Sequence, residues 1–136
     1  MNQTYSILLV DDNRPWRQDT ARCLAGVGLV ILDAGTGREA IEMARIHKPH
    51  ASILDMHMPD MTGLEVMRLL KSEDLAAPWI MISADAAQEV RRKALEEGAF
   101  SFLLKPISPD LLKYTVDRAL QSRFGKGPDL DDGPGR

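Results

Sequence analysis

The apolar residues of this chain fall into two alternating patterns. Short continuous apolar runs predict buried strands, and longer stretches with apolar residues three or four positions apart predict helices that bury one face. The runs that predict strands are residues 5–10, Leu29–Leu32, Ala51–Leu54, Trp79–Ile82 and Ala99–Leu104. A stretch with helical spacing follows each run, so the pattern predicts five strands that alternate with five helices.

A polar residue that can cap a helix stands at the start of every helical stretch. These residues are Asn13, Thr36, Thr62, Asp85 and Ser108. Glu39 and Glu65 each lie three residues after one of the threonines. This is the spacing of a capping box, in which each side chain binds the backbone N–H of the other residue. Gly26 and Gly28 are expected to end the first helix, and Gly98 the fourth.

The apolar stripe of each helix predicts which side chains face the sheet. The stripes consist of Trp16, Thr20, Cys23, Leu24 and Val27; Ala40, Ile41 and Ala44; Val66, Met67 and Leu70; Ala87, Val90 and Ala94; and Leu112, Val116, Ala119 and Leu120. Cys23 is the one cysteine of the chain, so it has no partner for an internal disulfide. Its place in a stripe predicts a buried, inert thiol.

The alternation of strands and helices predicts an α/β fold. Parallel strands joined by right-handed helical crossovers form a doubly wound sheet with helices on both faces. At this size the common solution is the flavodoxin-like (βα)5 arrangement with strand order 2-1-3-4-5. In that order the first and third strands are neighbours at the switch point of the sheet.

Composition favours a single domain with a protein partner. The 136 residues are 44% hydrophobic and 27% charged, which is ordinary for a globular domain. We expect the domain to span residues 1–122, and residues 123–136, rich in Gly, Pro and Asp, to be a flexible tail or linker stub. A net charge of −3 disfavours direct binding of nucleic acid. No apolar stretch approaches the roughly 20 residues of a membrane span, and residues 1–4 lack signal-peptide features, so we expect a cytoplasmic location without membrane contact.

Polar side chains directly follow four of the five predicted strands. They are Asp11 and Asp12 after the first strand, Asp55 after the third, Ser83 after the fourth and Lys105 after the fifth. Because the carboxyl ends of parallel strands lie along one edge of a sheet, these residues are expected to converge there. Asp33 follows the second strand at the margin of the sheet and is expected to be a bystander.

Three carboxylates within a few ångström of one another would repel strongly unless a cation lay among them. All-oxygen ligation by a few carboxylates, with room for water and phosphate, suits Mg²⁺. For Asp11 and Asp12 alone, a solvated loop is the simpler interpretation. The matching positions of Asp55, Ser83 and Lys105 favour a metal-dependent site.

These residues also carry a resemblance to a known family. The acidic pair, Asp55 with the following Met-Pro-x-Met-x-Gly run, the Ser-Ala after the fourth strand and the Lys-Pro after the fifth resemble the receiver domain of bacterial two-component response regulators, including chemotaxis regulators. The resemblance covers about Ser6 to Gln121. It implies a phosphoprotein that acts in phosphorelay signal transduction.

The resemblance implies how the acidic residues would act. Asp55 would be the phosphoacceptor, taking a phosphoryl group from a sensor histidine kinase, a phosphotransfer protein or a small phosphodonor. Asp12 and Asp55 would bind Mg²⁺ through their carboxylates, His57 would bind it through its backbone carbonyl, and Asp11 would hold metal-bound water.

The resemblance also implies a switch. Ser83 would hydrogen-bond one phosphoryl oxygen, Lys105 would pair with another, and the Lys105–Pro106 peptide bond would be cis. Ser83 would move toward the phosphoryl group and Phe102 would turn inward, altering the face made by the fourth helix, fifth strand and fifth helix. A downstream effector protein or domain would read that face, and phosphorylation would allow a dimer. From the sequence alone, Phe102 is equally compatible with a plain core position.

Three other functions compete with this one. A haloacid-dehalogenase-type phosphohydrolase normally has a second Asp two residues after the first, where this chain has His57. A flavodoxin proper would need a phosphate loop in place of Asp11 and Asp12, which would repel the cofactor. The main alternative is a degenerate receiver that acts as an unphosphorylated docking module. Because every expected site position is filled, we favour a phosphoacceptor that catalyses only its own phosphorylation and dephosphorylation and is not an enzyme in the usual sense.

Overall fold

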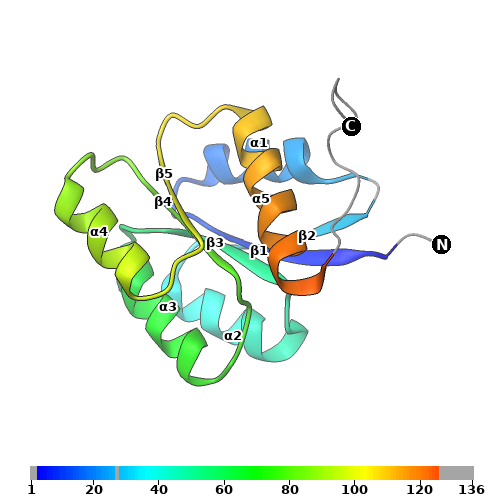
Figure 1. Ribbon diagram of the computed structural model, residues 1–136, viewed down its shortest axis with the longest axis horizontal. Coiled ribbons are helices and arrows are strands. Elements are labelled where there is room, and N and C mark those ends of the chain that lie inside the picture. Colours follow the sequence, from blue (N-terminus) through cyan, green and yellow to red (C-terminus); the bar gives the residue numbers. More distant parts are fainter. Residues whose placement is uncertain (1–2, 27, 126–136) are drawn as a thin grey trace.

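The computed structural model describes residues 3–26 and 28–125. Five parallel strands form one sheet of order β2-β1-β3-β4-β5, with helices on both faces (Figure 1). The strands are β1 (Tyr5–Val10), β2 (Leu29–Ala34), β3 (Ala51–Asp55), β4 (Trp79–Ser83) and β5 (Ser101–Leu104). The helices are α1 (Arg14–Leu24), α2 (Gly37–His47), α3 (Gly63–Ser72), α4 (Gln88–Glu96) and α5 (Pro109–Phe124). The predicted flavodoxin-like (βα)5 fold is therefore confirmed.

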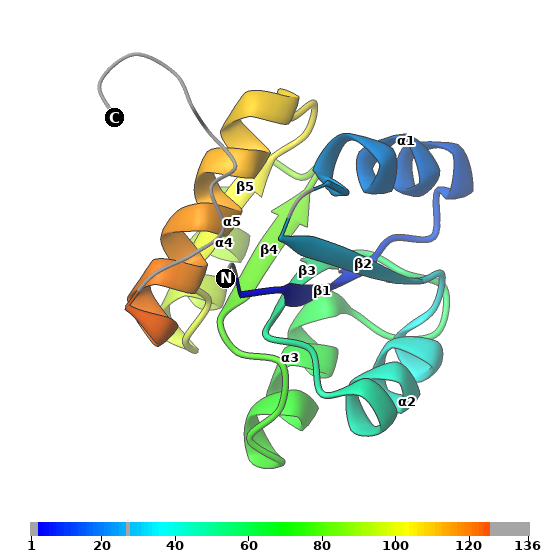
Figure 2. The same cartoon turned by 90° about the vertical axis from the view of Figure 1, so that its right-hand side faces the viewer.

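The helices divide into two layers around the sheet. Helices α1 and α5 cover one face, and α2, α3 and α4 cover the other (Figure 1). Figure 2 shows α1 and α2 on opposite sides of strands β1 and β2. Because both faces are covered, the inner strands are mostly apolar instead of alternating regularly between apolar and polar residues.

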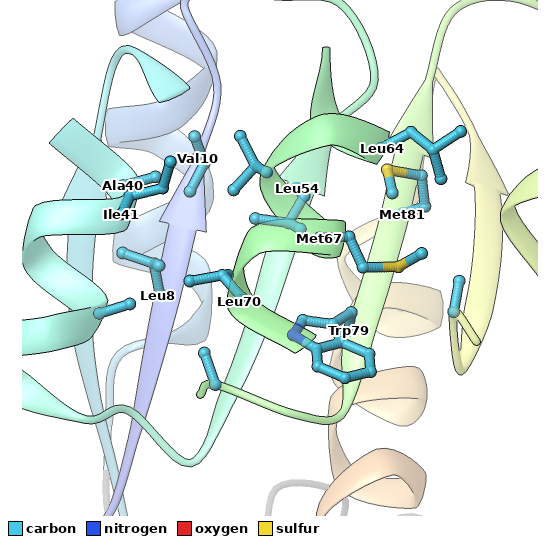
Figure 3. Close-up of a cluster of buried hydrophobic side chains, with 14 of the residues drawn as sticks. Leu8, Val10, Ala40, Ile41, Leu54, Leu64, Met67, Leu70, Trp79 and Met81 are labelled. Carbon is cyan, nitrogen blue, oxygen red and sulfur yellow. The ribbon is translucent and has the colours of Figure 1, made fainter. Parts of the chain in front are cut away.

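Successive strand residues therefore enter two separate cores. In β1, Leu8 and Val10 face α2 and α3, whereas Ile7 and Leu9 face α1 and α5. The first core is shown in Figure 3, where Leu8, Val10, Leu54 and Met81 from the strands meet Ala40, Ile41, Met67 and Leu70 from the helices. Fully burying a side chain such as Leu8 contributes about 1.5–3 kcal/mol. These two cores fix the carboxyl ends of the strands, where the polar residues lie.

Four of the five predicted helix caps are confirmed. The side chains of Asn13, Thr36, Thr62 and Ser108 each accept a hydrogen bond from a backbone N–H of the first turn. Thr62 and Glu65 form the complete capping box predicted for α3. These starts are local features of the sequence, which is why they were predictable.

The start of α4 differs from the prediction. The helix begins at Gln88 with Ala87 as its N-cap and has no side-chain cap. Asp85 instead accepts a hydrogen bond from the backbone N–H of Ala87 at 2.9 Å, so its side chain closes a turn before the helix. Ala87 is exposed and does not face the sheet as expected. The predictions that Val90 and Ala94 face inward are confirmed.

Cys23 also differs from the prediction, because it is exposed. The buried side of α1 runs through Thr20 and Leu24, which are four residues apart, and Cys23 lies at the margin of this narrow stripe. The helix ends at Leu24, just before the glycines predicted to end it. Val27 lies outside the described residues.

The carboxyl end of the described chain is helical. Helix α5 continues through Phe124, and Gly125 ends it with a left-handed backbone conformation. The remainder of the predicted tail lies outside the described residues. Within residues 3–26 and 28–125, no helix has the length and apolar character required to cross a membrane.

Candidate functional site

The register of the strands brings their polar ends to one edge of the sheet. Val10 pairs with Leu54, Asp55 with Ile82 and Ser83 with Leu104. The ends of β1, β3, β4 and β5 therefore lie along the same side of the sheet. The sheet therefore collects side chains that are up to 94 residues apart in sequence, as the hydrogen bond between Lys105 and Asp11 shows.

An acidic cluster lies at this edge. Asp11, Asp12 and Asp55 each offer a carboxylate oxygen, and the three oxygens lie within 4.8 Å of one another. Asp11 is completely buried and Asp55 is 6% exposed, whereas Asp12 faces solvent. The predicted convergence of the three acids is confirmed, and the site is open on one side.

Lys105 reaches the cluster from the end of β5. Its Nζ atom lies 2.5 Å from Asp11 Oδ2 and 3.8 Å from Asp55 Oδ2. Its backbone N–H donates to the carbonyl oxygen of Ser83, which extends the pairing of β4 with β5. The Lys105–Pro106 peptide bond is cis, as predicted. The ammonium group thus balances part of the negative charge of the cluster.

The environment of Asp55 disfavours its charged form. Burial and the negative charges of Asp11 and Asp12 raise the pKa of its carboxyl to about 6, although the Lys105 ammonium and the backbone N–H of His57 act in the opposite direction. One lysine therefore does not balance three acids. A hard divalent cation bound by carboxylate oxygens would restore the charged form of Asp55, so the three acids fit a metal ion.

The other predicted site residues are Ser83, His57 and Phe102. Ser83 is buried, and its hydroxyl accepts a hydrogen bond from the backbone N–H of Asp85 at 2.9 Å. His57 projects its imidazole toward solvent, where Nε2 lies 3.8 Å from Asp85 Oδ2. Phe102 is partly buried and packs against the core beneath α2, α3 and α4.

Arg17 contacts the backbone of the acidic cluster, and the sequence did not predict this contact. Its Nη1 donates to the backbone carbonyl of Asp11 at 2.6 Å, and its Nε donates to Asp33 Oδ2 at 2.8 Å. Asp33, expected to be a bystander, is not part of the acidic cluster, but it fixes the guanidinium that holds the backbone of Asp11. Helical spacing gives no signal for this contact, because Arg17 is not among the apolar residues of the stripe.

The loop after β3 is held by two further features that sequence reasoning did not assign to the site. Asp60 accepts hydrogen bonds from the backbone N–H groups of Gly37 and Arg38, both at 2.9 Å, so it caps α2 from another loop. These two N–H donors lower the pKa of Asp60. Gly63 passes so close to Asp55 that a Cβ atom there would lie 2.3 Å from the backbone oxygen of Asp55. The glycine of the Met-Pro-x-Met-x-Gly run was the available signal.

The fold and the site together define a flavodoxin-like α/β domain with an acidic, metal-compatible site at the carboxyl edge of its sheet. A sequence profile described as the response regulator receiver domain matches residues 7–117. The chain therefore belongs to the response regulator receiver domain family. A receiver domain is a signalling module and not a conventional enzyme.

Comparison with curated proteins gives several relatives. The chain is 34% identical to the regulatory protein LuxO of Vibrio cholerae over 98 residues, which are 72% of this chain and 22% of LuxO. It is 34% identical to the probable transcriptional regulatory protein TcrX of Mycobacterium tuberculosis over 123 residues, 90% of this chain and 52% of TcrX. It is 35% identical to the regulatory protein AtoC of Escherichia coli over 116 residues, 85% of this chain and 25% of AtoC. The chain thus spans about a fifth to a half of the length of these relatives.

Solved structures agree with this assignment. The CheY-like receiver domain protein of Methanospirillum hungatei superposes with a TM-score of 0.81 at 25% identity, covering 88% of this chain and 96% of that one. The chemotaxis response regulator CheY4 of Vibrio cholerae gives a TM-score of 0.79 at 28% identity, covering 86% of this chain and 99% of that one. The predicted family resemblance is confirmed.

Proposed function

We propose that this domain is a phosphorylation-activated receiver in which Asp55 accepts a phosphoryl group from a sensor histidine kinase or a phosphotransfer protein. The observation that supports the proposal most directly is the convergence of three acids and one lysine at the carboxyl edge of the sheet. Asp55 is the nucleophile because it ends the central strand β3 and lies within 3.8 Å of Lys105.

Mg²⁺ is the proposed cofactor. Asp12 and Asp55 would hold it through their carboxylates, His57 through its backbone carbonyl, and Asp11 through metal-bound water. When bound, Mg²⁺ neutralises the charge of the carboxylates and of the phosphoryl oxygens. The raised pKa of Asp55 supports this assignment, because the apo site lacks enough positive charge to keep all three acids ionised.

The chain's own residues then supply position and charge. A carboxylate oxygen of Asp55 attacks phosphorus while the P–N bond to the donor imidazole breaks, and the electron pair stays on that nitrogen, which takes up a proton from water. The ionised carboxylate needs no general base. Lys105 and Ser83 would stabilise the negative charge that spreads over the phosphoryl oxygens in the loose transition state.

Ser83 and Phe102 are the proposed switch residues. Ser83 would turn its hydroxyl from the backbone of Asp85 to a phosphoryl oxygen, and Phe102 would move further into the core that it already contacts. The movement would alter the surface of α4, β5 and α5. A downstream effector protein or domain, or a second copy of the chain, would recognise the altered surface.

The test is phosphorylation by a small donor. Incubation with Mg²⁺ and acetyl phosphate should add one phosphoryl group, seen in the intact mass and lost on hydroxylamine treatment, as expected of an acyl phosphate. Asp55→Asn should abolish the gain in mass without loss of fold. Asp110→Asn serves as the matched control, because Asp110 is an exposed acid in the first turn of α5 and is not part of the acidic cluster.

The alternative is a receiver that docks its partner without phosphorylation. If the wild-type chain takes no phosphoryl group from acetyl phosphate, phosphoramidate or a histidine kinase, this alternative replaces the proposal. The presence of all three acids favours the phosphoacceptor role, because a docking module does not require three converging carboxylates.

A further inference from the structure

The indole ring of Trp16 covers the ammonium group of Lys105. The Nζ atom lies 4.5 Å from the centroid of the ring. Trp16 stands in the first turn of α1, and its backbone N–H donates to the capping side chain of Asn13 at 3.1 Å. The helix start that follows the acidic pair therefore also fixes the position of the ring. By sequence alone, Trp16 is only one residue of the apolar stripe of this helix.

The ring completes a three-sided environment for the ammonium. Asp11 lies on one side at 2.5 Å and Asp55 on another at 3.8 Å, while the indole covers a third. The side chain of Lys105 is only 20% exposed as a result. The face of an indole ring attracts a cation through its quadrupole, and the attraction is stronger where water is excluded. Without the indole ring, the side chain of Lys105 would populate several solvated rotamers.

We propose that Trp16 is a positioning residue for Lys105, holding the ammonium beside Asp55 before the phosphoryl group arrives. The inference rests on the role proposed for Lys105 in phosphoryl transfer. A preorganised ammonium stabilises developing charge without first having to be ordered, so the benefit of the ring is in the rate of transfer and not in the binding of the donor.

Packing is the competing explanation for Trp16. The ring is partly buried against the core beneath α1 and α5, and it lines a groove of about 180 Å³ together with Cys23, Ile107 and Leu112. A residue that only filled this space would tolerate leucine as well as phenylalanine. A residue that binds a cation would not, because leucine has no aromatic face. Trp16→Phe and Trp16→Leu therefore separate the two explanations.

The first measurement is a thermodynamic cycle that needs no phosphorylation. The unfolding free energies of Trp16→Leu, Lys105→Met and the double variant are compared, with methionine chosen because it keeps the length of the lysine stem. We expect the double variant to lose less unfolding free energy than the two single variants lose in sum. The same cycle with Trp16→Phe should show a smaller departure from additivity. Additive losses in both cycles would overturn the proposal. Trp79, buried and with its ring N–H bonded to the carbonyl of Leu75, reports by its fluorescence that each variant is folded.

The second measurement is the phosphorylation rate as a function of acetyl phosphate concentration at saturating Mg²⁺. We expect Trp16→Leu to lower the maximal rate roughly two- to fivefold and to leave the half-saturating donor concentration unchanged. Trp16→Phe should recover most of the rate. Equal rates for the two variants, or a change confined to half-saturation, would overturn the positioning role. A wild-type chain that takes no phosphoryl group would overturn the proposed function instead, and the thermodynamic cycle would still decide whether Trp16 binds Lys105.

Discussion

The ammonium of Lys105 lies closer to Asp11 than to Asp55, at 2.5 Å against 3.8 Å. Asp11 is completely buried, so its carboxylate depends on this contact and on the backbone N–H of Asn13 for compensation. Lys105 is thus the resident counter-ion of the metal-free cluster. A divalent cation among the same oxygens would be repelled by it.

This relationship predicts opposite effects of two substitutions on magnesium affinity. Lys105→Met should raise the affinity, on the order of tenfold at low salt, because a positive charge that contacts the acidic cluster is removed. Asp12→Ala removes one ligand and should abolish most of the thermal stabilisation that Mg²⁺ gives the wild-type chain. Titration calorimetry and melting curves at fixed Mg²⁺ concentrations measure both effects.

Lys93→Met is the matched control, because Lys93 is an exposed lysine of α4 that is not part of the site. Its magnesium affinity should equal that of the wild type. Weaker binding in Lys105→Met, or an unchanged magnesium response in Asp12→Ala, would contradict the assignment of the metal site to this cluster.

The raised pKa of Asp55 predicts how magnesium binding depends on pH. Metal binding requires the carboxylate form, so below a pH of about 6 the ion must displace a proton. The affinity should fall by up to about tenfold for each further pH unit and level off above pH 7. Calorimetry in buffers of different ionisation enthalpy measures the released proton, which should be absent above pH 7.5. An affinity that is constant from pH 5 to pH 8 would show that Asp55 is already ionised in the apo site.

The same shift predicts the stability of the metal-free domain. Between the unperturbed value of 3.8 and about 6, folded Asp55 keeps a proton that the unfolded chain has released. The contribution of this residue to stability therefore falls as the pH rises through that window. With a chelator present, the unfolding free energy of the wild type minus that of Asp55→Asn should decrease as the pH rises over the same range. A difference that does not vary with pH would contradict the raised pKa.

The parts of the site that the sequence predicted are those fixed by strand order and by local capping. Asp55 and Lys105 could be placed because an apolar run leads directly into each, and the parallel register brings such ends together. Thr62 could be placed because its capping-box partner is only three residues away. The prediction failed for Cys23, whose helix stripe is narrow, and for Asp85, whose side chain bonds two residues ahead and so stays outside the helix.

The supports of the site were not predictable in the same way. Arg17 meets the backbone of Asp11 and the side chain of Asp33 only after β1, α1 and β2 have packed together. Asp60 reaches the start of α2 across 23 residues of sequence. Contacts of this kind depend on how two loops approach each other, and no periodicity in the sequence records that approach.

Asp60 should stabilise the fold through the start of α2. Asp60→Ala leaves the N–H groups of Gly37 and Arg38 without their acceptors, and we expect a loss of about 1 kcal/mol, the usual cost of removing an N-cap. Asp60→Asn keeps one acceptor oxygen and should lose less. Asp110→Ala, which removes an exposed acid from the first turn of α5, is the control. Chemical denaturation measures all three, and equal losses for Asp60→Ala and Asp110→Ala would contradict a specific cap.

Gly63 should be the least replaceable glycine of the site. An alanine Cβ there would lie 2.3 Å from the backbone oxygen of Asp55 and 3.0 Å from Met56 Cα, and backbone atoms cannot move aside as a flexible side chain can. Gly63→Ala should therefore cost at least about 2 kcal/mol of stability, and its magnesium affinity should fall because the end of β3 must shift. Gly26→Ala is the control, since a Cβ at Gly26 meets no atom within 4 Å. Denaturation and magnesium titration of both variants give the comparison. A stable Gly63→Ala variant with wild-type magnesium affinity would show that the loop after β3 does not position the acidic cluster.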